Sequence, residues 1–278
     1  SNEFLRINHK DLLFSNRDTV KKIGEFCGFK LKKDVSDIVN LDLYRNRRMS
    51  KNCKIIATYF GPRRNKPNGV DETIEFWESN VLKYECEVDP GVDMDTIIIN
   101  HDFGDEKVKE YLKTIDGKQT KRGVIRVYNR EWEDGIGGSF ASFNKGFEVF
   151  INDYDYWFFT EDNVIMVHDG YYELALNQLN KSGDAFICCM RAGGIKHKNK
   201  HCDGACGLTS KKILTELHDR LGNLPYSKEP IDTNIQEKIK LNDLTAFKSV
   251  HSEVQTKPNS WYHKFCYEGE VKFTNELV

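Results

Sequence analysis

Apolar residues along positions 52–225 follow the spacing of strands and then that of helices, several times in succession. Residues 53–60, CKIIATYF, form a short apolar run that ends at a Gly-Pro pair, which predicts a strand followed by a loop. Residues 71–88 carry apolar side chains at roughly helical spacing, and residues 94–100, MDTIIIN, are typical of a strand buried on both faces. The same pattern predicts helices at 105–115 and 139–153, strands at 123–129, 154–163 and 184–190, and a glycine-rich turn at 135–138.

Strands that alternate with helices in this way predict an α/β fold with an open, mostly parallel central sheet and helices on both faces. Ligands of such sheets bind beyond the carboxyl ends of the strands. The segments expected at those ends are 58–61, 100–102, 129–131 and 161–163. We therefore expect a binding site to be built from these four segments.

Two adjacent carboxylates, Glu161 and Asp162, follow the apolar residues of the fourth of these strands. Adjacent carboxylates repel each other and lose hydration unless a cation or hydrogen-bond donors compensate them. A hard divalent cation that joins them to a diphosphate is one such compensation, and Mg²⁺ or Mn²⁺ suits oxygen ligands. The alternative is a solvated turn whose acids favour the start of a following helix.

The residues around these acids resemble the GT-A glycosyltransferases. Residues 154–174 are similar to the Glu-Asp-Asp variant of the acidic motif of that family. Upstream, residues 127–147 resemble its Asn…Gly…Ala…Asn-Lys/Arg-Gly segment, and the loops at 58–65 and 97–106 resemble the ends of its first two strands. The resemblance implies a GT-A, Rossmann-like domain over residues 52–225.

The resemblance also implies an enzyme that transfers a sugar from a nucleotide-sugar donor to a carbohydrate or glycan acceptor, with inversion and with a divalent metal. In this family the first strand end lines the pocket for base and ribose, and the second closes its far side. The third strand end and the next helix lie near the base or diphosphate, and the acids face ribose and sugar. By this resemblance, the base and ribose pocket is lined by Thr58, Tyr59, Phe60 and Arg63, and its far side is closed by Asn100 and Asp102. The residues near the base or diphosphate are Asn129, Arg130 and Asn144, and those facing ribose and sugar are Glu161 and Asp162.

One position departs from the family, because Asn163 stands where the third carboxylate binds the metal. An amide oxygen ligates Mn²⁺ or Mg²⁺ without charge, so the resemblance predicts a weaker metal site here. Asp162 is an alternative ligand, and His263 is the candidate third ligand from the C-terminal segment. A histidine beside aromatic residues is also a common surface or core-edge residue.

The basic, glycine-rich segment 191–207 is similar to the acceptor loop of the family, and a helix is expected after it, capped by Thr209 or Ser210 and ended by Gly222. Asp203 is the only carboxylate in the segment, which makes it the candidate base that removes the proton of the acceptor hydroxyl. The alternative is an aspartate that stabilises a turn. A zinc site is a further alternative for this stretch, with ligands from His197, His201, Cys202 and Cys206.

Asn163 also favours a second function, a non-catalytic GT-A-like domain that binds a nucleotide or acts as a scaffold. A nucleotidyltransferase is the third hypothesis, since its sheet is similar. It needs a dense glycine-rich basic loop after the first strand, and FGPRRNKPNG at 60–69 has basic residues and two glycines without that spacing.

Composition adds limits on partners and location. The formal net charge is -2, which provides no overall field that would attract nucleic acid. No apolar run approaches the ~18 residues that a membrane span needs, so we expect no transmembrane segment. The eight cysteines have irregular spacing, which favours reduced thiols and a cytoplasmic location.

The two ends differ from the middle. Residues 3–50 resemble the C-terminal end of sulfotransferases, without the phosphosulfate-binding loop and catalytic base of that family. We therefore expect 1–51 to be a small helical accessory segment; the alternative is an unrelated helical leader. Residues 226–278 are expected to be an extension or lid.

Overall fold

The computed structural model describes residues 21–22, 25–26, 52–61, 69–189, 206–230, 269 and 272–276. The chain divides into two units, 1–49 and 50–278. In the first unit the described residues are helical and exposed, and Lys21 lies 4.0 Å from Glu25. Most of the sulfotransferase-like segment and most of the expected C-terminal lid lie outside the described residues.

The second unit contains the sheet and its helices. Its described elements are, in chain order, β1 (Asn52–Thr58), α4 (Val70–Phe76), the π-helical η1 (Trp77–Leu82), α5 (Lys83–Glu87), β2 (Asp95–His101), α6 (Glu106–Ile115), β3 (Ile125–Arg130), the 3-10 helix η2 (Glu133–Gly135), α7 (Gly138–Phe150), β4 (Tyr156–Glu161), α8 (Tyr171–Ser182), β5 (Phe186–Cys188), β6 (Gly207–Ser210), α9 (Lys211–Leu221) and α13 (Lys272–Glu276).

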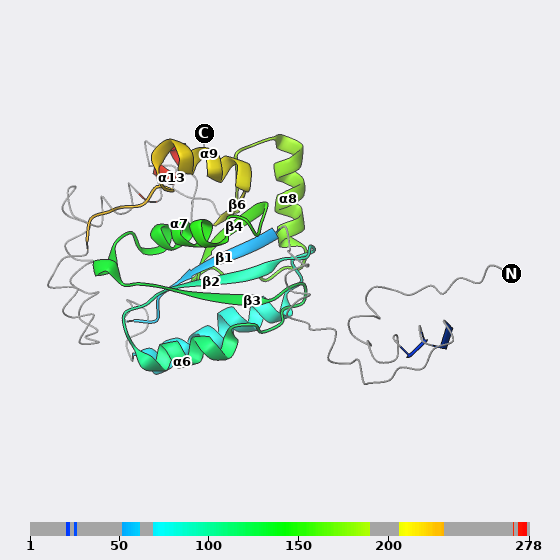
Figure 1. The fold of residues 1–278 in the computed structure, drawn as a ribbon, viewed down its shortest axis with the longest axis horizontal. Helices are drawn as coiled ribbons and strands as arrows, with labels where there is room; N and C mark the ends of the chain where they lie inside the picture. Colours follow the sequence, from blue (N-terminus) through cyan, green and yellow to red (C-terminus); the bar gives the residue numbers. More distant parts are fainter. Residues whose placement is uncertain are drawn as a thin grey trace. The chain divides into compact units, whose positions relative to one another are not determined.

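Six strands form one sheet in the order β3-β2-β1-β4-β6-β5 (Figure 1). Strands β1 to β4 are parallel to their neighbours, whereas β6 is antiparallel to both β4 and β5. The predicted fold class is confirmed to this extent: the chain has a mixed α/β fold with a mostly parallel central sheet flanked by helices.

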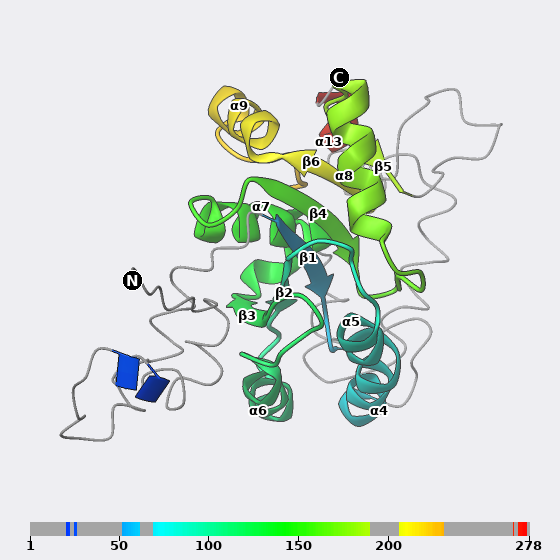
Figure 2. The same cartoon turned by 90° about the vertical axis from the view of Figure 1, so that its right-hand side faces the viewer.

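Helices lie in two layers, one on each face of the sheet (Figure 2). On one face, Ile55 and Ile99 pack with Phe143 of α7, Leu217 of α9 and Phe273 of α13. On the other face, one apolar cluster joins the strands to η1 and α6, and a second cluster joins them to α8. Because side chains alternate along a strand, both faces of β1 and β2 are apolar, as the continuous hydrophobic runs of these segments predicted.

Local capping explains where several helices begin and end. The carboxylate of Asp105 accepts from the backbone N–H groups of Lys107 and Val108 and begins α6. The hydroxyl of Ser210 accepts from the N–H of Ile213 at 3.4 Å and begins α9, and Gly222 ends it with a φ of 79°. The predicted cap and stop of α9 are therefore confirmed.

The helix predicted at 71–88 is present, but its middle turn, η1, is π-helical. The side chains of Ser79 and Asn80 donate to the carbonyls of Glu75 and Phe76, at 2.7 and 2.9 Å. These bonds satisfy carbonyls at the point where the regular helical ladder changes. Trp77, Val81 and Leu82 keep their inward position, because η1 remains packed in the core.

Strand β6 was not predicted, since its residues were assigned only to the end of the glycine-rich segment 191–207 and to the cap of the following helix. It is four residues long and has no hydrophobic alternation that would reveal it. Its existence depends on pairing with β4, where Trp157 lies opposite Thr209 and Phe159 lies opposite Gly207. The interaction is tertiary, so local sequence does not determine it.

Candidate functional site

The ends of four parallel strands meet at one edge of the sheet, which we call the carboxyl edge. The register pairs Thr58 with Asn100, and Asn100 with Asn129. On the other side of β1, Ala57 pairs with Glu161, so Asp162 follows directly beside Thr58. The predicted convergence of the strand-end segments is therefore present in the sheet.

Asp162 is buried and held by β1. Its carboxylate oxygen Oδ2 accepts a 2.5 Å hydrogen bond from Thr58 Oγ1, and its backbone N–H donates to the carbonyl of Ala57 at 3.2 Å. Thr58 and Asp162 are each 4% exposed. The Thr58 hydroxyl thus compensates part of the negative charge of the Glu161–Asp162 pair. The neighbouring residue Glu161 is half-buried, and Asn163 is exposed.

Asn100 is fully buried at the carboxyl edge. Its Nδ2 donates to Asn129 Oδ1 at 3.0 Å, while its own Oδ1 has no hydrogen-bond partner among the described residues. Exchanging the oxygen and nitrogen of both amides would keep the bond and leave the Asn100 nitrogen without a described partner instead. Either assignment leaves one buried polar atom unsatisfied by the described residues, at a typical cost of about 1–3 kcal/mol.

An aromatic cluster lies beside these polar residues. The ring of Trp132 stacks on those of His101 and Tyr59, with centroids 4.5 and 5.7 Å apart, and Phe103 meets Tyr59 edge-on at 5.6 Å. The Tyr59 ring also covers Gly61, where a Cβ atom would come within 2.1 Å of the tyrosine hydroxyl oxygen. Sequence analysis included His101 only as part of the strand-end segment 100–102 and missed Phe103 and Trp132, although both are aromatic residues directly after such segments.

His101 is neutral in this environment. Burial, and then the positive charge of Arg130, lower its pKa from 6.5 to about 3, against the opposing effect of its bond to the Trp132 carbonyl. Since a carbonyl only accepts, the neutral ring must donate from Nε2 to Trp132 O, which lies 2.9 Å away. His101 Nδ1 therefore carries the lone pair.

Arg130 stabilises the turn that leads into α7. Its guanidinium donates to the carbonyl of Gly138 at 3.1 Å and to the carbonyl of Ile136, and lies 3.5 Å from the hydroxyl of Ser142. The side chain is buried, and this burial lowers its pKa from the usual arginine value. These contacts direct the guanidinium toward the glycine-rich turn.

Three other predicted site residues have partners within the fold. Asn144 Nδ2 donates to Glu148 at 2.8 Å, and Asn144 Oδ1 accepts from the backbone N–H of Leu224 at 2.8 Å. Asp102 accepts from the N–H of Gly104 at 2.8 Å. Phe60 is fully buried and packs in the core against Trp77 and Tyr111 rather than at an open surface.

Arg63, Asp203 and His263 lie outside the described residues, as do His197, His201 and Cys202 of the zinc alternative. Within the residues that the structure describes, no group of three or more His, Cys, Asp and Glu side chains could hold a metal ion. The predicted ligands that are described, Asp162 and Asn163, differ in exposure, the first being buried and the second exposed. The metal remains a prediction.

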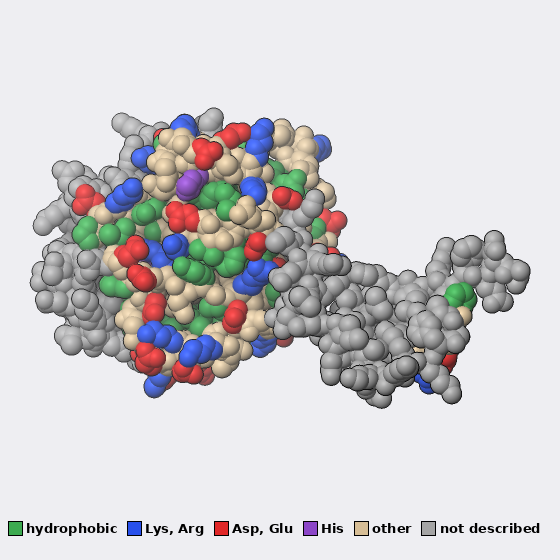
Figure 3. Space-filling view, in the orientation of Figure 1, with side chains coloured by type: hydrophobic (Ala, Val, Ile, Leu, Met, Phe, Trp, Pro, Cys, Tyr) green, Lys and Arg blue, Asp and Glu red, His purple; other side chains and the backbone are tan. Residues whose placement is uncertain are grey.

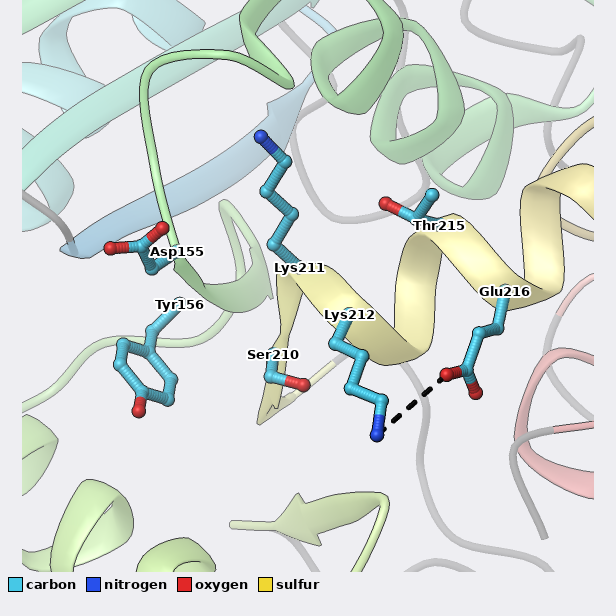
Figure 4. Close-up of a pocket in the computed structure, with 7 residues that line it drawn as sticks. All are labelled: Asp155, Tyr156, Ser210, Lys211, Lys212, Thr215 and Glu216. Atoms are coloured by element: carbon cyan, nitrogen blue, oxygen red, sulfur yellow. Dashed lines mark ion pairs between the residues drawn. The ribbon is translucent and has the colours of Figure 1, made fainter.

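A hollow of about 570 Å³ lies at the opposite edge of the sheet, where β4 begins and β6 ends (Figure 4). It is lined by Asp155, Tyr156, Ser210, Lys211, Lys212, Thr215 and Glu216. The lining contains acids and bases in equal number, and Lys212 lies 3.9 Å from Glu216. Because the hollow lies where β4 begins, it is separate from the strand ends that carry Thr58, Asn100 and Asp162.

Acidic and basic side chains are interspersed over the face shown in Figure 3. Examples on α6 are the pairs Lys109–Glu106 at 2.7 Å and Lys113–Glu110 at 2.6 Å. Among the described helices, none has the length and apolar character required to cross a membrane.

Solved structures that resemble this chain include the two that follow. One is S. aureus TarS 1-349, with 9% identity and a TM-score of 0.41 over 70% of this chain and 56% of that one. The other is 4-diphosphocytidyl-2C-methyl-D-erythritol synthase from Anaerococcus prevotii, with 12% identity and a TM-score of 0.37 over 69% of this chain and 81% of that one. The chain thus spans little more than half of the TarS fragment. No protein-family model and no curated protein sequence matches it. Likenesses this distant say nothing about substrate or mechanism.

Proposed function

We propose that this chain is a glycosyltransferase that binds a nucleotide-sugar at the carboxyl edge and transfers the sugar to a carbohydrate acceptor. The observation that supports this most directly is the group formed there by Thr58, Asp162, Asn100 and Asn129. Open α/β sheets bind ligands at this edge. One atom of the buried Asn100 amide has no partner among the described residues, so a ligand that supplies the missing hydrogen bond would be stabilised there.

A nucleotide fits the chemistry of this group. Its base presents N–H and C=O groups that pair with an amide, and its flat rings stack on aromatic side chains. Tyr59 and Trp132 provide aromatic surface next to Thr58 and Asn100. The ribose and the sugar carry hydroxyl groups, for which Glu161 is a suitable acceptor in this proposal.

The proposed metal is Mn²⁺ or Mg²⁺. Its candidate ligands are Asp162 and Asn163, which belong to the described residues, and His263, which does not. One oxygen of Asp162 already accepts from Thr58, and Asn163 contributes no charge. This donor set fits a hard cation that the donor diphosphate also ligates, and it predicts weak binding of the cation alone. Once bound, the cation would neutralise charge on the departing diphosphate.

In the proposed inverting reaction, an acceptor hydroxyl oxygen forms a bond to the anomeric carbon of the donor sugar. The bond from that carbon to the diphosphate breaks on the opposite side, and the nucleoside diphosphate leaves with the bonding electron pair. A carboxylate takes the proton of the hydroxyl, and Asp203 is the candidate for this role.

Titration of UDP, GDP and dTDP into the full chain, with and without Mn²⁺, tests the proposal. We expect one nucleotide to bind and its sugar derivative to be hydrolysed or transferred. N100L should weaken nucleotide binding about tenfold or more, because the leucine cannot supply the hydrogen bond. Thr215 is a matched control, since its Oγ1 is also buried without a described partner but lies on α9 at the opposite edge; T215V should leave affinity unchanged.

Failure of all three nucleotides to bind a folded chain, with and without Mn²⁺, would refute the proposal. Binding without donor hydrolysis or transfer would instead support the second candidate, a non-catalytic nucleotide-binding domain, which the neutral side chain of Asn163 favours. Release of pyrophosphate from a nucleoside triphosphate and a sugar phosphate would identify the third candidate, a nucleotidyltransferase.

A further inference from the structure

Two cysteines lie opposite each other where strands β5 and β6 meet. The antiparallel register pairs Cys188 with Gly207, so the next step along the ladder pairs Cys189 with Cys206. The backbone N–H of Cys189 donates to the carbonyl of Cys206 at 2.9 Å, which continues the ladder to this pair. Neither cysteine forms a disulfide bond in the structure.

The register places the two thiols on the same face of the sheet, one residue beyond the ends of β5 and β6. Residues directly opposite in an antiparallel pair share a face, and the face alternates along each strand. Cys206 packs with Leu208 in the cluster beneath α8, and Ile187 packs against the same cluster. Cys189, two residues after Ile187, therefore lies on this face, and Cys188 lies on the other.

Tyr171 of α8 lies within electrostatic range of both thiols. Its hydroxyl pKa is raised well above the usual value, first by burial and then by negative charge on Glu85, Cys189 and Cys206. Both thiols are thus close enough to one hydroxyl group to influence it. This agrees with the position that the strand register gives them.

The spacing of this pair suits a covalent bond. Hydrogen-bonded residues that face each other in an antiparallel ladder have Cα atoms about 5.5 Å apart, within the range of about 4.4–6.8 Å found for disulfides. We propose that Cys189 and Cys206 are a redox-active pair that forms an intrachain disulfide across β5 and β6. The bond joins the two ends of the 16-residue segment 190–205.

The two cysteines have different roles in the exchange reaction with a disulfide oxidant such as oxidised glutathione. Cys189 is exposed, and its thiolate attacks one sulfur of the oxidant, forming a mixed disulfide and releasing one glutathione thiolate. Cys206 is 1% exposed, and its thiolate then attacks the Cys189 sulfur and releases the second glutathione. The protein loses two protons and two electrons, and the oxidant becomes two molecules of reduced glutathione.

The rate of this exchange should depend strongly on pH. Although Cys189 is exposed, the surrounding chain partly desolvates its thiol and raises its pKa to about 11, so only a small fraction is thiolate near neutral pH. At pH values below the pKa, the thiolate fraction increases about tenfold for each unit by which the pH is raised. The exchange should therefore accelerate roughly a hundredfold from about pH 7 to about pH 9. A disulfide that forms at the same rate at both pH values would contradict the role of Cys189 as the attacking thiol.

Peptide mapping tests the bond in the full chain. After exposure to oxidised glutathione and alkylation of free thiols, trypsin should release a disulfide-linked pair of peptides, 182–191 and 201–211. Each peptide contains a second cysteine, Cys188 or Cys202, so fragmentation of the wild-type pair must assign the bond. C188S/C202S leaves only the proposed pair in these peptides and should still give the linked product, whereas C189S and C206S should not.

Thermal unfolding provides a second measurement. The oxidised chain should melt on the order of 5–10 °C above the reduced chain, because the bond restricts the unfolded state. C189S should melt at the same temperature under both conditions. A folded wild-type chain whose two cysteines remain fully alkylated after oxidation, or a linked peptide that persists in C189S, would overturn the proposal. Neither result depends on nucleotide binding, so the proposed transferase function is tested separately.

Discussion

The two edges of the sheet differ in how their buried carboxylate and amide side chains are paired. At the amino edge, the carboxylate of Asp95 accepts from the N–H of Val124 at 3.0 Å and from the hydroxyl of Tyr154 at 2.9 Å, and Arg126 bonds Asp153 at 3.0 Å. At the carboxyl edge, one amide atom of Asn100 has no partner among the described residues. Within the same part of the chain, unpaired indole or hydroxyl groups occur at both edges, in Trp132 at the carboxyl edge and in Trp157 and Thr215 toward the amino edge. Buried groups that the fold does not satisfy are expensive, so they are most easily explained where a ligand completes them.

This difference predicts which substitutions should change stability and which should change ligand binding. Changes to polar networks that the protein completes by itself should lower stability without affecting ligands. Changes at the carboxyl edge should affect ligand binding with little loss of stability. The following predictions test this contrast.

The largest effect is expected for the ion pair of Lys54 and Glu85, which lies between β1 and α5. Lys54 is 1% exposed, contacts Glu85 Oε1, and lies 5.2 Å from the ring of Tyr171, while Glu85 Oε2 accepts from Thr96 at 3.0 Å. K54M leaves the glutamate charge buried without its cation and should lower the free energy of unfolding by about 3–5 kcal/mol in urea denaturation.

The double variant K54M/E85L is the control for this prediction, because it removes both charges and should recover most of the loss. Nucleotide affinity should be unchanged in every variant that remains folded. If K54M alone cost less than about 1 kcal/mol, the pair would not be an essential part of the buried network.

The next effect concerns the amino edge. Y154F keeps the ring of Tyr154, which is 2% exposed, but removes the hydroxyl that donates to Asp95. The free energy of unfolding should fall by about 1–3 kcal/mol, because the buried carboxylate loses a donor. Y156F is the matched control, since Tyr156 lines the open hollow, and it should change stability by less than about 0.5 kcal/mol.

A smaller effect is expected for His101 in acid. Its pKa is about 3 in the folded chain and 6.5 as a reference, so the unfolded chain binds a proton first as the pH falls. The stability contribution of neutral His101 is therefore present above pH 6.5 and is lost progressively between pH 6.5 and 3. The loss should be about 1 kcal/mol between pH 6.5 and about pH 5.5.

Urea denaturation at several pH values measures this loss, and H101N serves as the comparison because its amide can still donate to Trp132. The wild-type curve should fall more steeply than that of H101N through this range. Parallel curves for the two proteins would mean that His101 is not held neutral.

The smallest change in stability is expected at Asn100. N100L removes a buried polar atom that has no described partner, and the Asn129 side chain left behind is exposed and can bond to water. Stability in urea should change by less than about 1 kcal/mol, while nucleotide affinity falls as proposed above. A large loss of stability with unchanged affinity would remove the contrast between the two edges.

Sequence patterns predicted β1 to β4 and the helices between them, because their determinants are local. Continuous apolar runs, helical spacing and the Ser210 and Gly222 signals act within a few residues. The polar residues at the strand ends followed from the same pattern. The predicted roles of these residues in binding donor and metal remain to be measured.

Contacts between distant parts of the chain could not be predicted in this way. The bond from Thr58 to Asp162 spans 104 residues, and the stacking of Trp132 on Tyr59 and His101 depends on which strands are neighbours. Strand β6 and the pairing of Cys189 with Cys206 likewise exist only through the antiparallel ladder.

The sequence by itself determined that β1 to β4 and the helices between them form, since backbone propensity, capping and hydrophobic period are properties of neighbouring residues. Only the tertiary structure decided which polar and aromatic side chains meet, and which of them remain unsatisfied within the described chain. The physical reason is that strand order and register set these contacts, and a shift of one residue would turn each side chain to the other face.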